Sequence, residues 1–143
     1  FSEAIRIRPD DRSAVLGRAW TKRNLGDFRG ARDDFSEVIR MDPNDYAAFP
    51  GRAWAKYDLG DFRGALDDFS EAIRIRPDDR SAVLGRAWTK RNLGDFRGAR
   101  DDFSEVIRMD PNDYAAFPGR AWAKYDLGDF RGALDDFSEA IRI

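Results

Sequence analysis

The chain repeats itself without a difference over more than half of its length. The heptapeptide Phe1–Ile7 recurs as Phe69–Ile75 and as Phe137–Ile143, which sets a period of 68 residues. Shifting the 143-residue chain by 68 aligns 143 − 68 = 75 positions, and all of them are identical. Such repetition predicts a linear array of similar units, in which each unit contacts its neighbours, instead of a domain with one central core.

A shorter period of 34 residues lies inside this unit. Arg12–Asp45 aligns with Tyr46–Asp79, and 22 of the 34 positions are identical. We therefore expect a single array over 1–143, with full repeats at 12–45, 46–79 and 80–113, a truncated repeat at 114–143, and the partial second helix of a preceding repeat at 1–11. The absent initiator Met and the cut within a repeat favour a segment of something longer, whose targeting signals would not be visible. Natural and engineered duplication both remain open.

Apolar residues recur at helical spacing in each repeat. Within Tyr46–Asp79 this spacing predicts two antiparallel helices, at about 46–59 and 63–75, with the apolar positions Phe49, Ala53, Tyr57, Phe62, Ala65, Phe69, Ala72 and Ile73.

The residues around these helices predict where each one ends. Gly60 suits the left-handed position after the first helix, and Asp61 can cap the second. Pro77 ends the second helix by keeping the residue before it out of helical angles, and Asp79 is placed to cap the next helix. Pro50 falls in a first turn, where its missing N–H costs little.

These positions carry a family resemblance. The 34-residue pattern resembles the tetratricopeptide repeat (TPR), and also an arginine–glycine-like variant of it. The signature residues are Phe49, Ala53, Leu59-Gly60, Ala65, Phe69, Ala72 and Pro77, and in the preceding repeat Val15, Ala19, Leu25-Gly26, Ala31, Phe35, Val38 and Pro43. The resemblance implies an all-α fold, an α-solenoid of helix–turn–helix repeats that coils into a right-handed superhelix.

The resemblance is incomplete at a few positions. Arg18, Lys22, Arg52 and Lys56 stand where the family usually has large apolar residues. We expect their aliphatic stems to cover the core while the charges reach water.

Composition excludes several kinds of chemistry. The chain has no Cys and no His, which removes thiolate nucleophiles, zinc–sulfur sites and the commonest general base. The net charge of −2 gives no reason to expect nucleic acid, and no apolar run is long enough for membrane insertion. We expect a protein that is not an enzyme and has no cofactor, while the compartment stays unknown.

Charged pairs on the second helices invite a metal reading, which their geometry disfavours. Asp33-Asp34 and Asp67-Asp68 are adjacent in a helix, so their side chains diverge and are expected to form a solvated face. Arg29 with Asp33, and Arg63 with Asp67, have the i, i+4 spacing of helical ion pairs.

The resemblance implies that ligands lie along the first helix of each repeat. In this sequence those positions are Ala47, Pro50, Trp54, Tyr57 and Asp58, and in the preceding repeat Ser13, Leu16, Trp20, Arg23 and Asn24. All four tryptophans share one phase of the repeat, beside a row in which Arg and Tyr alternate. These residue types are enriched in binding hot spots. The candidate concave-face site is therefore Trp20, Trp54, Trp88, Trp122, Arg23, Tyr57, Arg91, Tyr125, Leu16, Pro50, Asn24 and Asp58.

Structural roles compete with this interpretation. A tryptophan in every repeat could pack between neighbouring repeats, and the Arg and Tyr row could be solvated or ion-paired. The Lys and Asn clamp with which one TPR subclass grips acidic chaperone tails is absent, because Leu16 or Pro50, and Trp20 or Trp54, occupy its first-repeat positions.

Two functions follow. The first is a protein–protein interaction scaffold that binds a peptide or protein in the concave groove. The alternative is a structural protein that assembles head to tail with copies of itself into a filament, or is a slice of a longer fibre. The complementary ends would be Phe1, Ala4 and Ile5 on one side, and Leu134, Phe137 and Ile141 on the other.

Overall fold

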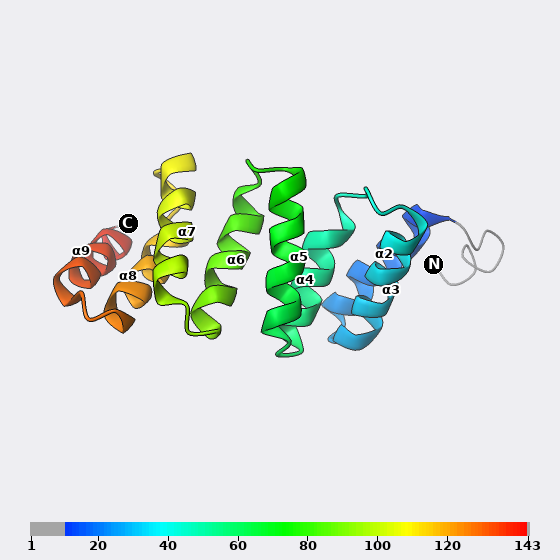
Figure 1. The fold of residues 1–143 in the computed structure, drawn as a ribbon, viewed down its shortest axis with the longest axis horizontal. Helices are drawn as coiled ribbons and strands as arrows, with labels where there is room; N and C mark the ends of the chain where they lie inside the picture. Colours follow the sequence, from blue (N-terminus) through cyan, green and yellow to red (C-terminus); the bar gives the residue numbers. More distant parts are fainter. Residues whose placement is uncertain (1–10, 143) are drawn as a thin grey trace. The chain divides into compact units, whose positions relative to one another are not determined.

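A computed structural model describes residues 11–142 of the chain, and every element in this range is an α-helix (Figure 1). The helices are α2 (Arg12–Asn24), α3 (Phe28–Met41), α4 (Ala48–Asp58), α5 (Phe62–Ile75), α6 (Arg80–Asn92), α7 (Phe96–Met109), α8 (Ala116–Asp126) and α9 (Phe130–Ile141). They pair into helix–turn–helix repeats, which confirms the predicted all-α solenoid class. We call the first helix of each repeat helix A (α2, α4, α6, α8) and the second helix B.

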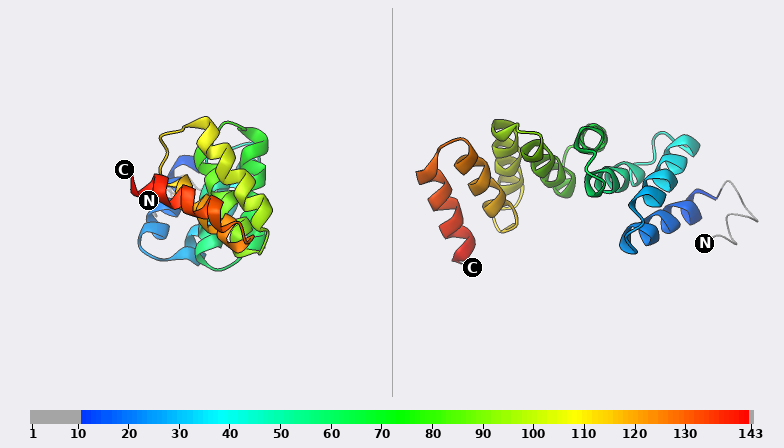
Figure 2. Two further views of the ribbon diagram at one scale, coloured as in Figure 1. Left: turned by 90° about the vertical axis from the view of Figure 1, so that its left-hand side faces the viewer. Right: turned by 90° about the horizontal axis from the view of Figure 1, so that it is seen from below.

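The described residues divide into two compact units. Residues 11–76 hold α2 to α5, and residues 77–142 hold α6 to α9. In each unit, helix A lies beside helix B of its own repeat, as α8 and α9 do in the right-hand view of Figure 2, and the second repeat stacks through its helix A on the first repeat's helix B. Each unit is therefore a pair of stacked repeats.

The turns inside each repeat follow the sequence signals. Gly60 has φ of 83°, and the Asp61 carboxylate accepts a hydrogen bond from the Gly64 backbone N–H at 3.0 Å. A Cβ at position 64 would collide with that same carboxylate, so Gly64 is there to admit the cap. The observed α4 starts two residues after the predicted start, because Tyr46 and Ala47 form a turn held by the Asp45 side chain.

The two repeats of a unit approach each other closely at Gly51. This glycine of α4 is buried against Phe35 of α3, and a Cβ at position 51 would overlap the Phe35 ring. Phe35 itself is fully buried. The same arrangement recurs between Gly119 and Phe103 in the second unit. A small residue here sets how closely α3 and α4 stack.

The prediction of a solvated acidic face is wrong for one residue of each pair. Asp34 and Asp68 are only 5% and 4% exposed, whereas Asp33 and Asp67 are exposed. Their neighbours explain why. Arg52 donates to both oxygens of Asp68 at 2.7 and 2.8 Å, and Lys56 adds an ion pair at 3.1 Å.

The same triad recurs in all four described repeats. Its members are Arg18, Lys22 and Asp34; Arg52, Lys56 and Asp68; Arg86, Lys90 and Asp102; and Arg120, Lys124 and Asp136. The expectation for Arg18, Lys22, Arg52 and Lys56 is thus incomplete, since these side chains stay partly exposed and also pair with a buried carboxylate. A buried charge is tolerated only when it is paired and hydrogen-bonded.

Ionisation of this carboxylate is favoured where the shift is resolved. Burial alone would raise the pKa of Asp34, but the hydrogen bonds from Arg18 and Lys22 and their positive charge bring it below its ordinary value. The Asp34 hydrogen bond in turn raises the pKa of Arg18. Asp34 and Arg18 therefore stay charged over the neutral range.

The predicted i, i+4 ion pairs on helix B are also wrong. Within residues 11–142, Arg63 forms no ion pair with Asp67, and Asp33 pairs with Arg32, at 3.3 Å, instead of Arg29. The order of charges explains the difference, because a cation that precedes its anion along a helix makes the weaker arrangement.

Candidate functional site

Each tryptophan of helix A packs against the phenylalanine of its own helix B. Trp20 meets Phe35 edge-on, with ring centroids 5.0 Å apart, and the pairs Trp54–Phe69, Trp88–Phe103 and Trp122–Phe137 repeat this geometry at 5.0 to 5.1 Å. Edge-to-face pairs of this kind add roughly 0.5–1.5 kcal/mol beyond area burial. The rings keep some exposure, and 42% of Trp122 is accessible. Each indole thus packs on a phenylalanine with one side and keeps another side accessible to solvent.

The alternating Arg and Tyr row has internal partners. Arg23 of α2 donates to Asp58 of α4 at 2.8 Å, and its guanidinium lies 5.9 Å from the Trp54 ring centroid. Arg91 repeats both contacts with Asp126 and Trp122. Within each unit the arginine therefore ties one helix A to the next.

The tyrosines of this row have ring contacts. Tyr57 lies edge-on between Trp54, at 5.4 Å, and Phe62, at 5.2 Å. Tyr125 makes the equivalent contacts with Trp122 and Phe130. These rings extend the aromatic surface from helix A to the start of helix B.

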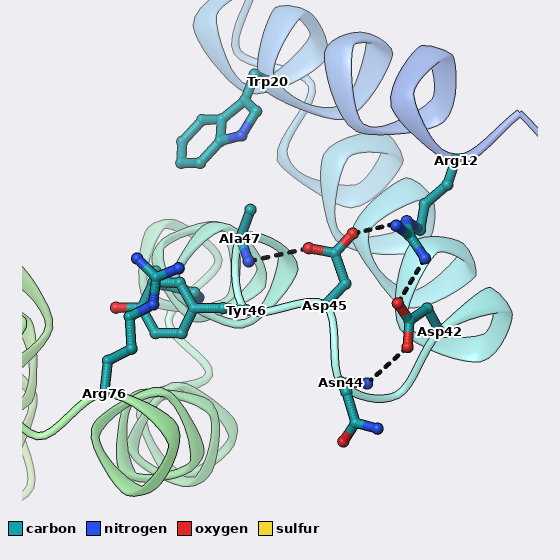
Figure 3. A pocket seen from close by; sticks show the side chains of 9 residues that line it. Arg12, Trp20, Asp42, Asn44, Asp45, Tyr46, Ala47 and Arg76 are labelled. Atoms are coloured by element: carbon teal, nitrogen blue, oxygen red, sulfur yellow. Dashed lines mark hydrogen bonds and ion pairs between the residues drawn. The ribbon is translucent and has the colours of Figure 1, made fainter.

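A groove of about 620 Å³ opens in the first unit beside Trp20. Its lining comes from α2, the loop from α3 to α4, the start of α4 and the end of α5 (Figure 3). We call it the Trp20 groove, and its lining residues are Arg12, Trp20, Asp42, Asn44, Asp45, Tyr46, Ala47, Pro50 and Arg76. Its volume is in the range of pockets that bind small ligands or short peptide segments.

One wall of the groove is a closed ion-pair network. Arg12 pairs with Asp42 through one nitrogen and with Asp45 through another, at 2.9 Å. The second oxygen of Asp42 accepts from the Asn44 N–H at 3.0 Å, and the second oxygen of Asp45 accepts from the Ala47 N–H at 3.1 Å. All four carboxylate oxygens are thus already engaged, as the dashed lines in Figure 3 show.

The opposite wall carries a second arginine in a different setting. The Arg76 guanidinium lies 4.2 Å from the centroid of the Tyr46 ring, in a cation–π contact. The Arg76 backbone N–H donates to Ala72 at 2.8 Å and ends α5. Among residues 11–142 no carboxylate pairs with this guanidinium.

The second unit repeats the first wall. Arg80 pairs with Asp110 at 2.8 Å and with Asp113 at 3.0 Å, and the Asn112 and Ala115 N–H groups close the same two caps. The ion-pair network of this loop therefore occurs in both units.

The structure brings together only part of the predicted concave-face set. Trp20 and Pro50 line the groove, together with Ala47, which the resemblance also implied. Arg23, Trp54 and Asp58 form their own cluster, as described. Leu16 packs partly buried against the core, and Asn24 is exposed outside the groove lining.

Sequence reasoning missed the polar residues of the groove. Arg12, Asp42, Tyr46 and Arg76 occupy positions that differ between the two repeats, and they differ together. The first repeat has Arg at position 1 and Asp at position 31, whereas the second has Tyr and Arg. The first pair forms an ion pair and the second a cation–π contact. This paired difference was the available signal.

The described residues contain no cluster of acidic side chains arranged to hold a metal ion. No helix among them is long and apolar enough to cross a membrane. What the groove offers is three apolar lining residues, Trp20, Ala47 and Pro50, beside the polar groups of Arg12 and Arg76. Such a surface can bind a chain segment through apolar contacts and hydrogen bonds.

Comparison with known families identifies the repeat. The sequence profile of the family described as Tetratricopeptide repeat matches residues 16–80, 51–113 and 84–143, which together cover most of the chain. A comparison with curated proteins finds no match.

Solved structures share the fold at low sequence identity. MamA from Desulfovibrio magneticus RS-1 is 16% identical, with a TM-score of 0.95 over 99% of this chain and 80% of that one. A tetratricopeptide repeat protein from Parabacteroides merdae is 20% identical, with a TM-score of 0.83 over 99% of this chain and 55% of that one. The first TPR domain of Spaghetti (RPAP3), bound to an HSP90 peptide, is 20% identical, with a TM-score of 0.79 over 82% of this chain and 93% of that one.

Proposed function

The chain belongs to the tetratricopeptide repeat family, and on that premise we propose that it is a non-enzymatic scaffold that binds a peptide or protein segment in the Trp20 groove. The observation that carries the proposal is the groove itself: about 620 Å³ beside the Trp20 ring, at positions where the family places ligands. Binding of an HSP90 peptide by one structural neighbour supports the proposal in kind. We also propose that the chain is of the arginine–glycine-like variant; the arginine that recurs in every described repeat and holds a buried aspartate supports this proposal.

The partner in this proposal is a protein segment and not nucleic acid. The net charge of −2 and the self-neutralised Arg12 network leave no broad basic surface in the groove. A chaperone tail bound through the Lys and Asn clamp is not proposed, since Pro50 and Trp20 occupy the positions discussed above. Trp20, Ala47 and Pro50 would bind apolar side chains of the segment.

The test blocks the groove without touching the core. Ala47 is exposed and lines the groove, so Ala47→Trp fills the space, whereas Leu25→Trp adds the same ring at an 80% exposed position outside the lining. Peptides are selected from a displayed random library on the wild-type chain, and their affinities are then measured by anisotropy. We expect Ala47→Trp to weaken binding about tenfold, or about 1.4 kcal/mol, and Leu25→Trp to leave it unchanged. Equal affinities for both variants would refute groove binding.

A specific observation favours self-assembly as a second candidate. On the last repeat, large apolar side chains remain exposed: Trp122, Tyr125, Phe130, Leu134 (63%) and Ile141 (82%). Phe130, Leu134 and Ile141 all belong to α9, and exposed apolar side chains that gather on one surface are typical of interaction sites. Of the predicted assembly residues, Leu134 and Ile141 are thus accessible and Phe137 packs on Trp122, while Phe1, Ala4 and Ile5 lie outside the described residues.

Sedimentation velocity over a range of concentrations separates the two candidates. Assembly through this face predicts a sedimentation coefficient that rises with concentration and a rise that Leu134→Glu abolishes. A concentration-independent monomer would remove the second candidate. The same Leu134→Glu variant should bind selected peptides as the wild type does, because position 134 lies outside the Trp20 groove.

A further inference from the structure

Among the described residues that line the Trp20 groove, Arg76 alone has a charge without an ion-pair partner, and we infer that the groove selects a peptide segment whose carboxylate, from an acidic side chain or from a C-terminus, is bound by Arg76. This inference rests on the proposed function and names the chemistry of the partner. It concerns the two walls of the groove, which differ in how their charges are satisfied.

The wall at Arg12 cannot recruit a further ion at low cost. Its two carboxylates accept from Arg12 and from two backbone N–H groups, so every carboxylate oxygen has a donor. Arg12 in turn is neutralised by two anions. A ligand charge placed here would have to break an existing ion pair.

The wall at Arg76 is open to an anion. Its guanidinium has a ring contact with Tyr46 and no carboxylate partner among the described residues. A guanidinium presents several N–H donors in a planar fork that matches a carboxylate in two parallel hydrogen bonds. Stacking on Tyr46 leaves the edge of the fork free, because the ring covers only a face. Arg76 is therefore positioned in advance to receive a carboxylate.

The rest of the groove fixes what accompanies the carboxylate. Trp20 comes from α2 and projects toward Ala47 on the other side of the space, and Arg76 lies beyond Tyr46 (Figure 3). Trp20, Ala47 and Pro50 are the apolar part of the lining. A segment with an acidic group next to aliphatic side chains satisfies both features at once, whereas a basic segment would place its charge against Arg76.

The chain offers a matched control for the arginine. Arg74 lies two residues before Arg76, is exposed, and already pairs with Glu71 on the same helix. Arg74→Gln removes the same formal charge from the same region as Arg76→Gln, yet Arg74 does not line the groove. General electrostatic attraction would be weakened equally by the two changes, whereas direct recognition would be weakened by only one.

The experiment uses the full chain and three fluorescein-labelled heptapeptides. The first is Gly-Ser-Leu-Glu-Leu-Ser-Gly with an amidated C-terminus, the second has Gln for Glu and a free C-terminal carboxylate, and the third has Gln and an amidated C-terminus. Anisotropy gives each affinity for the wild type, Arg76→Gln and Arg74→Gln.

At least one carboxylate peptide should bind the wild type about fivefold tighter than the neutral peptide, the ratio that a partly exposed charge pair gives. Whichever carboxylate peptide binds tighter identifies the source. Arg76→Gln should abolish the ratio and Arg74→Gln should keep it, and added salt should reduce it.

Four results would overturn the inference: equal affinities for all three peptides, a ratio that survives Arg76→Gln, equal loss in both variants, or the absence of any measurable binding. The failure of this inference is distinguishable from the failure of the proposed function. Peptides that bind regardless of charge but are blocked by Ala47→Trp leave the groove as the binding site and remove only the role of Arg76.

Discussion

The buried aspartate of helix B should be a main determinant of stability, and its exposed neighbour should not. Asp68→Asn and Asp67→Asn make the same chemical change at adjacent positions of α5. Asp68 is 4% exposed and receives two hydrogen bonds from Arg52 and an ion pair from Lys56. Asp67 is exposed and has no ion pair among residues 11–142.

The magnitude follows from what the substitution leaves behind. Removing one member of a fully buried ion pair costs roughly 3–5 kcal/mol, because the other charge stays buried without a partner. Here the Arg52 and Lys56 side chains keep 21% and 18% exposure and can recover some hydration. We therefore expect Asp68→Asn to lower the free energy of unfolding by about 3 kcal/mol, and Asp67→Asn by less than about 0.5 kcal/mol.

Urea denaturation followed by circular dichroism measures both changes. The two positions share one helix and one unit, so the comparison holds whatever the size of the cooperative unfolding unit. Asp68→Asn should shift the midpoint clearly to lower urea while Asp67→Asn superimposes on the wild type. Equal shifts for the two variants would refute the idea that the triad, and not the acidic face as a whole, stabilises the repeat.

Three further results are expected. Gly51→Ala should lower the free energy of unfolding by about 1–3 kcal/mol through overlap with Phe35, and a urea midpoint at or above that of the wild type would contradict the close approach. Gly60→Ala should lower the free energy of unfolding by about 1 kcal/mol because φ is 83° at this position. The same urea titration measures the change, and a midpoint equal to that of the wild type would contradict it. The folded-state pKa of Asp34 is lowered, so its stabilisation is complete above its unfolded-state pKa of about 3.9 and is lost as pH falls through the folded-state pKa. An acid titration of stability in which Asp34→Asn loses as much as the wild type would rule out this contribution.

The fold could be predicted because its determinants are local. Gly60 and Asp61 act within one turn, and Pro77 acts on the residue before it, so the helix boundaries came out within two residues. The helix pair follows from apolar spacing and a short turn. None of this requires knowledge of distant contacts.

The charges could not be placed from spacing along one helix. Asp68 looked solvated because only α5 was considered, whereas its partners Arg52 and Lys56 come from α4, 16 and 12 residues earlier. Arg52 and Lys56 also stand where the family usually has apolar residues, and this departure pointed to a buried anion nearby. A cation in one helix and an anion in the next had to be considered together.

The residues of the candidate site were also predicted only in part. Trp20 and Pro50 were found because they recur in phase with the repeat, and both line the groove. Arg76 was missed because periodic reasoning favours positions that are the same in every repeat, and Arg76 stands at one that differs. In an array of near-identical repeats, the positions that differ together deserve the same scrutiny as those that recur.

Mapping where a selected peptide binds tests the central claim most directly. Backbone and indole chemical shifts of the labelled chain are recorded while the peptide is added to saturation. The scaffold account predicts that the largest changes fall on the Trp20 indole and on residues 42–50 and 76. Changes centred on the exposed faces of α3 and α5, such as Arg29 and Asp67, would contradict it.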